Sequence, residues 1–145
     1  MTKYIEQEQT KYWPVSAELM AQYKDGSHTY AFNGRLFWQN QNVQRHRDGD
    51  KPALIGADGS LEWYQYDKLH RDEDLPAVIG KDGQLEWYQN GKLHRFSGPA
   101  VIYPDGTHHW WVNDENITRE VKAWLNKKPW RGTPEQIFEF QLRFT

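Results

Sequence analysis

The sequence predicts a mainly β fold: a meandering antiparallel sheet of β-hairpin repeats, each about 24 residues long, with two short C-terminal α-helices. Three observations predict it: a repeated block, turn dipeptides at fixed places within each block, and helical periodicity after the last block. The 145 residues are expected to form a single domain. Its parts would be an N-terminal edge segment (1–24), the repeat array (25–116) and a helical segment (117–145).

The repeat is visible by direct alignment of three consecutive blocks. His46–Leu69 and His70–Leu93 align without a gap and share 17 of 24 residues. His94–Ile117 keeps the same frame, with one residue deleted before its proline. A repeat of this length is one supersecondary unit, which buries its apolar side chains by stacking on its neighbours. An array of stacked units follows.

Turn chemistry divides each block into strands. In the second block, Asp82–Gly83 separates the apolar run Pro76–Ile79 from the run Leu85–Gln89, and Asn90–Gly91 follows. Asn-Gly and Asp-Gly supply the positive φ angles that two-residue hairpin turns require. Each repeat is therefore expected to give two antiparallel strands and to advance the sheet by roughly 10 Å, since neighbouring strands lie about 4.8 Å apart.

The array is expected to begin before His46. Asp25–Leu36 aligns with Asp82–Leu93 without a gap and is interpreted as a degenerate earlier copy. Between the two lies Phe37–Arg45, which is predicted to be an extra hairpin or an irregular insertion. The segment 1–24, which Pro14 interrupts, is expected to cover the first edge of the sheet, because unprotected edges pair with other chains.

Two helices are predicted after the array. Ile117–Leu125 carries apolar residues at i, i+4, i+7 and i+8, which form one stripe of an amphipathic helix. Thr133–Gln136 is a capping box with proline at the first helical position, and the helix it opens should run through about Leu142. The apolar residues of this second helix are Ile137, Phe138 and Phe140. The helices should fold over one sheet face or cap the last hairpin.

Composition excludes several classes of function. Residues 1–117 carry 12 Lys/Arg against 17 Asp/Glu, whereas residues 118–145 carry 6 against 3. The acidic array argues against nucleic-acid binding, which needs a positive surface. The absence of cysteine excludes disulfides, thiolate catalysis and thiolate metal sites. No apolar stretch approaches a membrane span, so we expect a soluble, cytoplasmic protein with no membrane partner.

Strand parity places equivalent residues of successive repeats in rows across the sheet. The face with Trp63, Trp87 and Trp110, flanked by Leu61 and Leu85, is the better core candidate. The opposite face is the candidate partner-binding site, and it carries Tyr64, Tyr88 and Trp111 with Glu62, Glu86 and His109. Rings on a rigid sheet lose little entropy on binding and dominate many protein interfaces. In the alternative, the C-terminal helices cover this row and make it a second core.

The repeated histidines His46, His70 and His94 raise the question of a metal site. Equivalent residues in adjacent repeats should lie roughly 10 Å apart, whereas two ligands of one metal lie within about 4 Å. We therefore expect no metal and no cofactor. Instead, each imidazole and the arginine that follows it are expected to satisfy loop carbonyls within the repeats.

Catalysis is not indicated by any motif. The chain has no nucleophile elbow, P-loop or dinucleotide fingerprint, so no catalytic residue is assigned and the protein is not expected to be an enzyme. His108 and His109 replace Leu and Glu of the preceding repeat and stand near Asp105, which keeps a histidine-dependent hydrolase as a remaining alternative. Drift in the terminal repeat explains these two histidines as well.

The stretch NGKLHRFSGPAVIYPDGTHHWW (Asn90–Trp111) resembles MORN-type repeats, in the divergent form found in bacteriophage and giant-virus proteins. The resemblance spans about Asp25–Ile117, and Ile117–Phe144 is similar to the tail that follows such repeats in many large-phage proteins. It implies a β-hairpin array with an interaction role and is silent on activity. The glycine-rich frame of eukaryotic MORN repeats is missing, so their lipid-binding roles are not carried over.

These observations predict a protein–protein interaction module, phage-encoded, that binds a host or phage protein through the aromatic face. A second class is a small-ligand protein whose rings stack a nucleotide or a glycan. Edge strands at either end could also pair between chains, so a homodimer stays open.

Overall fold

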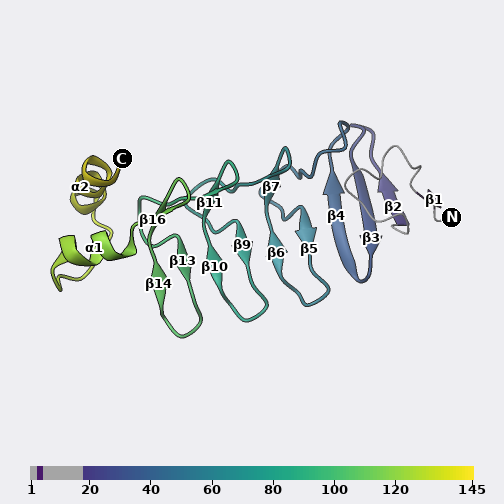
Figure 1. The fold of residues 1–145 in the computed structure, drawn as a ribbon. Helices are drawn as coiled ribbons and strands as arrows, with labels where there is room; N and C mark the ends of the chain where they lie inside the picture. The colour runs from purple at the N-terminus through teal and green to yellow at the C-terminus, as the bar shows by residue number, and fades with distance from the viewer. Residues whose placement is uncertain (1–2, 5–17) are drawn as a thin grey trace.

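The computed structural model describes residues 3–4 and 18–145, and it shows a long antiparallel sheet with two helices at its C-terminal end (Figure 1). The predicted fold class is confirmed. The sheet has ten strands, which neighbour one another in this order: β1 (Lys3–Tyr4), β2 (Glu18–Gln22), β3 (His28–Phe32), β4 (Arg35–Gln39), β5 (Leu54–Ile55), β6 (Leu61–Glu62), β9 (Val78–Ile79), β10 (Leu85–Glu86), β13 (Val101–Ile102) and β14 (His108–His109).

Three small hairpins stand beside this main sheet. They are β7 (Tyr64–Gln65) with β8 (Lys68–Leu69), β11 (Tyr88–Gln89) with β12 (Lys92–Leu93), and β15 (Trp111–Val112) with β16 (Glu115–Asn116). Figure 1 shows them following one another along the upper side of the main sheet. Each repeat therefore contributes two strands to the main sheet and two to a side hairpin, rather than two strands in all.

A corner at tryptophan separates the two pairs of strands. The predicted continuous strand Leu85–Gln89 is interrupted at Trp87, whose N–H donates to the Ala100 carbonyl of the next repeat at 2.8 Å. The Trp87 carbonyl accepts from the N–H of His94 at 3.0 Å. Because the tryptophan pairs with two different segments at once, the chain leaves the main sheet there and starts the side hairpin.

The two turn dipeptides act differently. Asn90 and Gly91 have φ angles of 52° and 83°, as a two-residue hairpin turn requires. In the Asp82–Gly83 turn only Gly83 has a positive φ, of 92°. The Gly80 N–H donates to the Gln84 carbonyl, and the Gly83 N–H donates to the Gly80 carbonyl. The Asp-Gly connection is therefore a three-residue loop, and the prediction of a two-residue turn is wrong there.

The array does begin before His46, but in a different register from the predicted one. The Trp38 N–H donates to the Ala53 carbonyl at 2.8 Å, and the Trp38 carbonyl accepts from the His46 N–H at 3.2 Å. Trp38 is thus the corner of the first copy. Its main-sheet turn is Asn33–Gly34, whereas the alignment with Asp82–Leu93 had placed that turn in a side hairpin.

Phe37–Arg45 contains a small hairpin-like turn, so of the two predicted alternatives the hairpin is the closer one and the irregular insertion is wrong. Its first residues end β4, and the rest forms a turn that a bridge between Gln39 and Arg45 closes. At the N-terminal end of the chain, in the predicted edge segment 1–24, β1 pairs with β2 and so covers the outer edge of β2. The remaining part of the predicted edge segment, including Pro14, lies outside the described residues.

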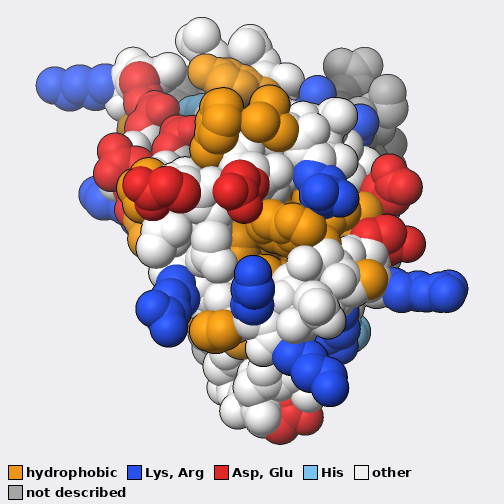
Figure 2. Space-filling view, turned by 90° about the vertical axis from the view of Figure 1, so that its left-hand side faces the viewer, with side chains coloured by type: hydrophobic (Ala, Val, Ile, Leu, Met, Phe, Trp, Pro, Cys, Tyr) orange, Lys and Arg blue, Asp and Glu red, His pale blue; other side chains and the backbone are white. Residues whose placement is uncertain are grey.

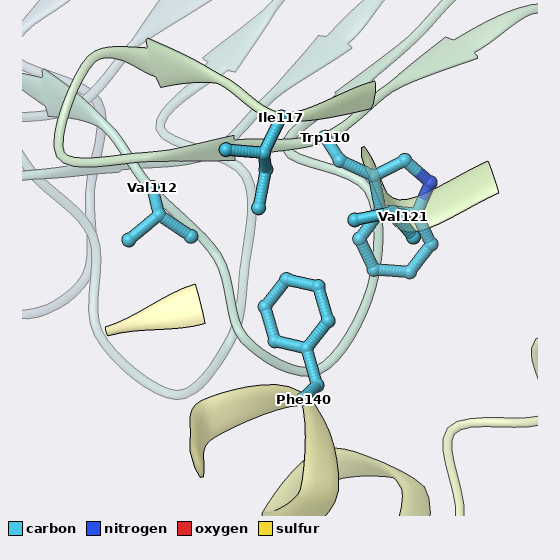
Figure 3. Packing of buried hydrophobic residues seen from close by; sticks show 5 residues of the cluster. All are labelled: Trp110, Val112, Ile117, Val121 and Phe140. Carbon is cyan, nitrogen blue, oxygen red and sulfur yellow. The ribbon is translucent and has the colours of Figure 1, made fainter. Parts of the chain in front are cut away.

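The helices α1 (Thr118–Leu125) and α2 (Pro134–Phe144) cap the last hairpin. Thr133 Oγ1 accepts the Gln136 N–H at 3.2 Å and Pro134 is the first helical residue, so the predicted N-terminus is confirmed. Phe140 is fully buried, whereas Phe138, another apolar residue of this helix, is 61% exposed. Figure 3 shows the packing of the cluster that joins helices and array: Trp110, Val112, Ile117, Val121 and Phe140.

The core of the array is not confined to the face predicted for it, because the buried Phe37 and Leu54 lie in the same cross-strand row as Glu62, on the predicted partner-binding face. Trp63, Trp87 and Trp110 are buried, as predicted, whereas Leu61 and Leu85 are only half-buried. Among the described residues, neither helix has the length and apolar composition needed to cross a membrane.

Candidate functional site

The predicted partner-binding residues form a row across the face of the sheet that also carries the buried Phe37 and Leu54. In the main sheet Glu62 pairs with Val78, Val78 with Glu86, Glu86 with Val101, and Val101 with His109. The first residue of each side hairpin comes two positions after Glu62, Glu86 or His109 in the sequence. We call the six predicted residues the Tyr–Glu row: Glu62, Tyr64, Glu86, Tyr88, His109 and Trp111. All six are half-buried.

Tyr64 is the best-held member of the Tyr–Glu row. Its hydroxyl donates to Glu62 Oε2 at 2.7 Å, and its ring packs against a buried cluster that includes Leu54. The Arg45 guanidinium lies 4.5 Å from the ring centroid. Burial, and then the hydrogen bond to Glu62 and its charge, raises the pKa of Tyr64 to about 12. Tyr64 therefore supports the fold as well as presenting a ring edge.

The next copy repeats this arrangement of a phenol and a carboxylate. Burial, followed by the charge and hydrogen bond of Glu86, raises the pKa of Tyr88 above its ordinary value. Glu86 also accepts a hydrogen bond from Gln84 Nε2. Each pair therefore presents an aromatic ring beside a negative charge, which is suited to hydrogen-bond donors and to cationic side chains.

The third copy carries an imidazole and an indole instead. The His109 ring meets Tyr103 edge to face, with centroids 5.6 Å apart. The Trp111 Nε1 atom is buried and, within the part of the chain that the structure describes, has no hydrogen-bond partner. This end of the Tyr–Glu row therefore differs in chemistry from the two Tyr–Glu pairs.

The C-terminal helices leave the Tyr–Glu row uncovered. They lie beyond the last strands in Figure 1, and their buried contacts are with Trp110, Val112 and Ile117. Figure 2 views this helical end, where apolar side chains gather in the middle among both basic and acidic side chains. The alternative in which the helices cover this row and make it a second core is therefore wrong, and the helices instead cap the last hairpin.

The repeated histidines bind neighbouring repeats together. The Nδ1 atom of His70 accepts the Asn90 N–H at 3.0 Å, and its Nε2 atom lies 2.9 Å from Asp72 Oδ1. His46 makes the same two contacts, with the Tyr66 N–H and with Asp48. The histidines thus bind backbone N–H groups rather than the predicted carbonyls. No group of three metal-ligating side chains occurs among the described residues.

In the third copy, Phe96 stands where the other repeats have an aspartate. His94 Nδ1 still accepts the Asn113 N–H, at 3.2 Å, and the imidazole meets the Phe96 ring edge to face. Burial lowers the pKa of His94, and the hydrogen bond with Asn113 opposes this effect. The imidazole therefore stays neutral over a wider pH range than an exposed histidine.

The arginines do satisfy carbonyls, as predicted, and they also make contacts that sequence reasoning missed. Arg71 Nη1 donates to the Pro76 carbonyl at 3.1 Å, and its guanidinium lies 3.7 Å from the Trp63 ring centroid. Its Nε and Nη2 atoms donate to both oxygens of Asp50 in the preceding repeat, at 2.8 and 3.1 Å. Arg95 repeats this arrangement with Asp74 and Trp87. These pairs could have been predicted from the sequence, because each arginine follows its aspartate by the same 21 residues.

The residues considered for a hydrolase are held by separate local contacts. Asp105 accepts the Thr107 N–H at 2.8 Å, and this contact lowers the pKa of the carboxyl. His108 is exposed, with Nδ1 3.1 Å from the Gly106 carbonyl oxygen, while His109 lies against Tyr103. The described contacts do not join the three into one site.

A scan against protein-family models gives no match for this chain. Searches of the curated proteins and of the solved structures find no match either.

Proposed function

We propose that this protein is a non-enzymatic interaction protein of the cytoplasm, phage-encoded, which binds a host or phage protein through the Tyr–Glu row. One observation carries the proposal: a row of half-buried rings and carboxylates crosses a rigid sheet, and the helices leave it uncovered. The resemblance of Asn90–Trp111 to MORN-type repeats also supports an interaction role.

Rigidity and charge both favour binding at this row. Tyr64 is fixed by its hydrogen bond to Glu62 and by its packing on Leu54, so it loses little conformational entropy when a partner binds. Residues 1–117 carry 17 Asp/Glu against 12 Lys/Arg. An acidic surface accelerates encounter with a basic one, so the partner is expected to present a basic patch.

Variants on the two sides of the sheet test the proposal with a matched control. The intact protein would be used to capture partners from host lysate, and each candidate would then be purified and its affinity measured by calorimetry. The paired substitutions Glu62→Gln and Glu86→Gln, and separately Tyr88→Ala, should weaken binding by about tenfold or more. Ile55→Thr and Ile79→Thr, on the opposite face, should leave the affinity unchanged.

A map of the contact then decides where the partner sits. Hydrogen exchange of the complex should show protection at the side hairpins and at β6 and β10. Binding that is equally strong in the Glu62/Glu86 variant and weakened by the Ile55 and Ile79 variants would place the interface on the other face and refute the proposal.

A small-ligand function is the second candidate, because a pocket adjoins the Tyr–Glu row. This pocket, of about 540 Å³, is lined by His46, Trp63, Tyr64, Tyr66 and Arg71 among others. Aromatic and charged side chains of this kind stack and orient bases and sugars. A thermal-shift screen with nucleotides and glycans separates the two candidates, since a ligand that binds only the native state raises its melting temperature.

A further inference from the structure

In the series of arginine–aspartate pairs, the first arginine has no carboxylate partner among the described residues. Arg71 takes both oxygens of Asp50, and Arg95 takes both oxygens of Asp74, at N–O distances of 2.8 to 3.1 Å. Each aspartate belongs to the repeat before its arginine. Arg47 stands at the start of the array, and within residues 18–145 no carboxylate contacts its guanidinium.

Arg47 is nevertheless held like the other two arginines. Its Nη1 atom donates to the Pro52 carbonyl at 3.0 Å, and its guanidinium lies 3.8 Å from the Trp38 ring centroid. The corresponding values for Arg95 are 3.1 Å and 3.8 Å. The same two anchors therefore fix the orientation of the guanidinium, and its Nε–Nη2 edge is the edge that binds aspartate in the later repeats.

A pocket of about 630 Å³ lies beside Arg47 and counts this residue in its lining. Lys51 adds a second positive charge to its lining, and the exposed rings of Tyr23 and Tyr66 border it. Burial lowers the pKa of Arg47, while the Tyr23 phenol acts in the opposite direction. A bound anion would compensate the partly desolvated cation.

The two acidic residues of this pocket are already engaged. Asp48 Oδ1 lies 2.9 Å from His46 Nε2, and Asp25 accepts hydrogen bonds from the N–H and the hydroxyl of Ser27. Asp72 contacts His70 in the same way as Asp48 contacts His46, and Arg71 still takes its carboxylate from elsewhere. Asp48 therefore does not replace the missing partner of Arg47.

We propose that the Nε–Nη2 edge of Arg47 binds a carboxylate supplied by an acidic side chain of a peptide segment, in the pocket between Trp38 and Lys51. The chain itself provides the template, since Asp50 and Asp74 show how a loop aspartate fills this position. A planar carboxylate matches the two parallel N–H groups of an arginine, and this geometry discriminates against an amide of the same shape.

NMR of the full chain tests the proposal, with the arginine Nε–H signals as the readout. The probe is the peptide acetyl-Gly-Asp-Gly-amide at constant ionic strength, and acetyl-Gly-Asn-Gly-amide is its control. The Asp peptide should shift the Arg47 Nε–H and Trp38 indole signals saturably, while the signals of Arg71 and Arg95 stay in place. The Asn peptide should cause no saturable shift.

Two variants and two further ions complete the test. Arg47→Lys keeps the charge but loses the paired donors, so it should weaken binding by about tenfold; Arg71→Lys should leave it unchanged. Acetate binding as tightly as the Asp peptide would assign the site to small carboxylates and refute the peptide source. Any one of three results would overturn the carboxylate site. Inorganic phosphate could bind more tightly than the Asp peptide, or the signals of all three arginines could shift equally. A folded Arg47→Lys protein could also bind the Asp peptide as tightly as the parent.

Discussion

The backbone N–H of Trp110 donates a hydrogen bond to Thr118 Oγ1 at 2.8 Å. In each earlier copy the equivalent tryptophan N–H donates to an alanine carbonyl of the following repeat, as Trp87 does to Ala100. No repeat follows Trp110, and the threonine hydroxyl takes the place of the missing carbonyl. The first side chain of α1 therefore supplies, at the end of the array, the acceptor that the next repeat supplies in the earlier copies.

Removing this hydroxyl should destabilise the C-terminal end of the array. In Thr118→Val the Trp110 N–H loses its acceptor in a largely buried position, which costs about 1–3 kcal/mol of unfolding free energy. Urea denaturation followed by tryptophan fluorescence measures this loss. Thr118→Ser keeps the oxygen atom and should retain most of the stability. If the valine variant were as stable as the serine variant, the hydrogen bond from Trp110 to Thr118 would not stabilise the end of the array.

Two phenylalanines of α2 provide a matched pair for the capping core. Phe140 is fully buried against Trp110 and Trp124, whereas Phe138 is 61% exposed on the same helix. Phe140→Ala should therefore cost about 3–5 kcal/mol. Phe138→Ala should stay within about 0.5 kcal/mol of the parent. Similar losses in the two variants, measured by urea denaturation, would mean that the helices do not pack as observed.

The raised pKa of Tyr64 predicts a loss of stability at high pH. Burial and Glu62 raise the pKa of this phenol from 10.0 to about 12, so the folded state favours the neutral form. Its stabilisation is complete below pH 10.0 and is lost as the pH rises towards about 12. Tyr64→Phe should flatten the fall in unfolding free energy over this window. Tyr66→Phe, at an exposed turn, is the control and should leave the slope as it is.

The arginine–aspartate pairs predict a loss of stability in acid. Arg71 holds the pKa of Asp50 below 3.8. For Asp74, burial acts to raise the pKa, but hydrogen bonds from Arg95 and Ser97 outweigh it and the pKa is again lowered. A carboxylate with a lowered folded pKa stabilises above pH 3.8, and this contribution disappears as the pH falls through the folded value.

Replacing these carboxylates should reduce that acid dependence. Because both pairs are partly exposed, Asp50→Asn and Asp74→Asn should each cost only about 0.2–1 kcal/mol at neutral pH. As the pH falls from 3.8 through the lowered pKa of the folded state, the variants and the parent should converge in unfolding free energy. Glu73→Gln, in the same loop as Asp74, is the control. A gap between the variants and the parent that persists in strong acid would show that the cost is not electrostatic.

Local patterns predicted local structure well and could not predict contacts between repeats. The Thr133 N-cap and the Asn90–Gly91 turn depend on neighbouring residues only, and both are confirmed, although the Gln136 side chain accepts the Arg131 N–H instead of completing the predicted capping box. The interruption at Trp87 was not predictable in the same way, because Leu85–Gln89 alternates like one strand. The corner forms only when the Ala100 carbonyl of the next repeat accepts the Trp87 N–H.

The sequence by itself determined that the chain forms stacked hairpins, since its blocks repeat with the same turn dipeptides and the same strand parity. It also determined which residues share a face, because Tyr64 and Tyr88 occupy equivalent positions at the start of two side hairpins. Tertiary structure decided which of these residues are partners: Arg71 finds Asp50, 21 positions away, and Arg47 finds no carboxylate among the described residues. The physical reason is that each such contact joins two repeats, so its geometry exists only once neighbouring copies have stacked.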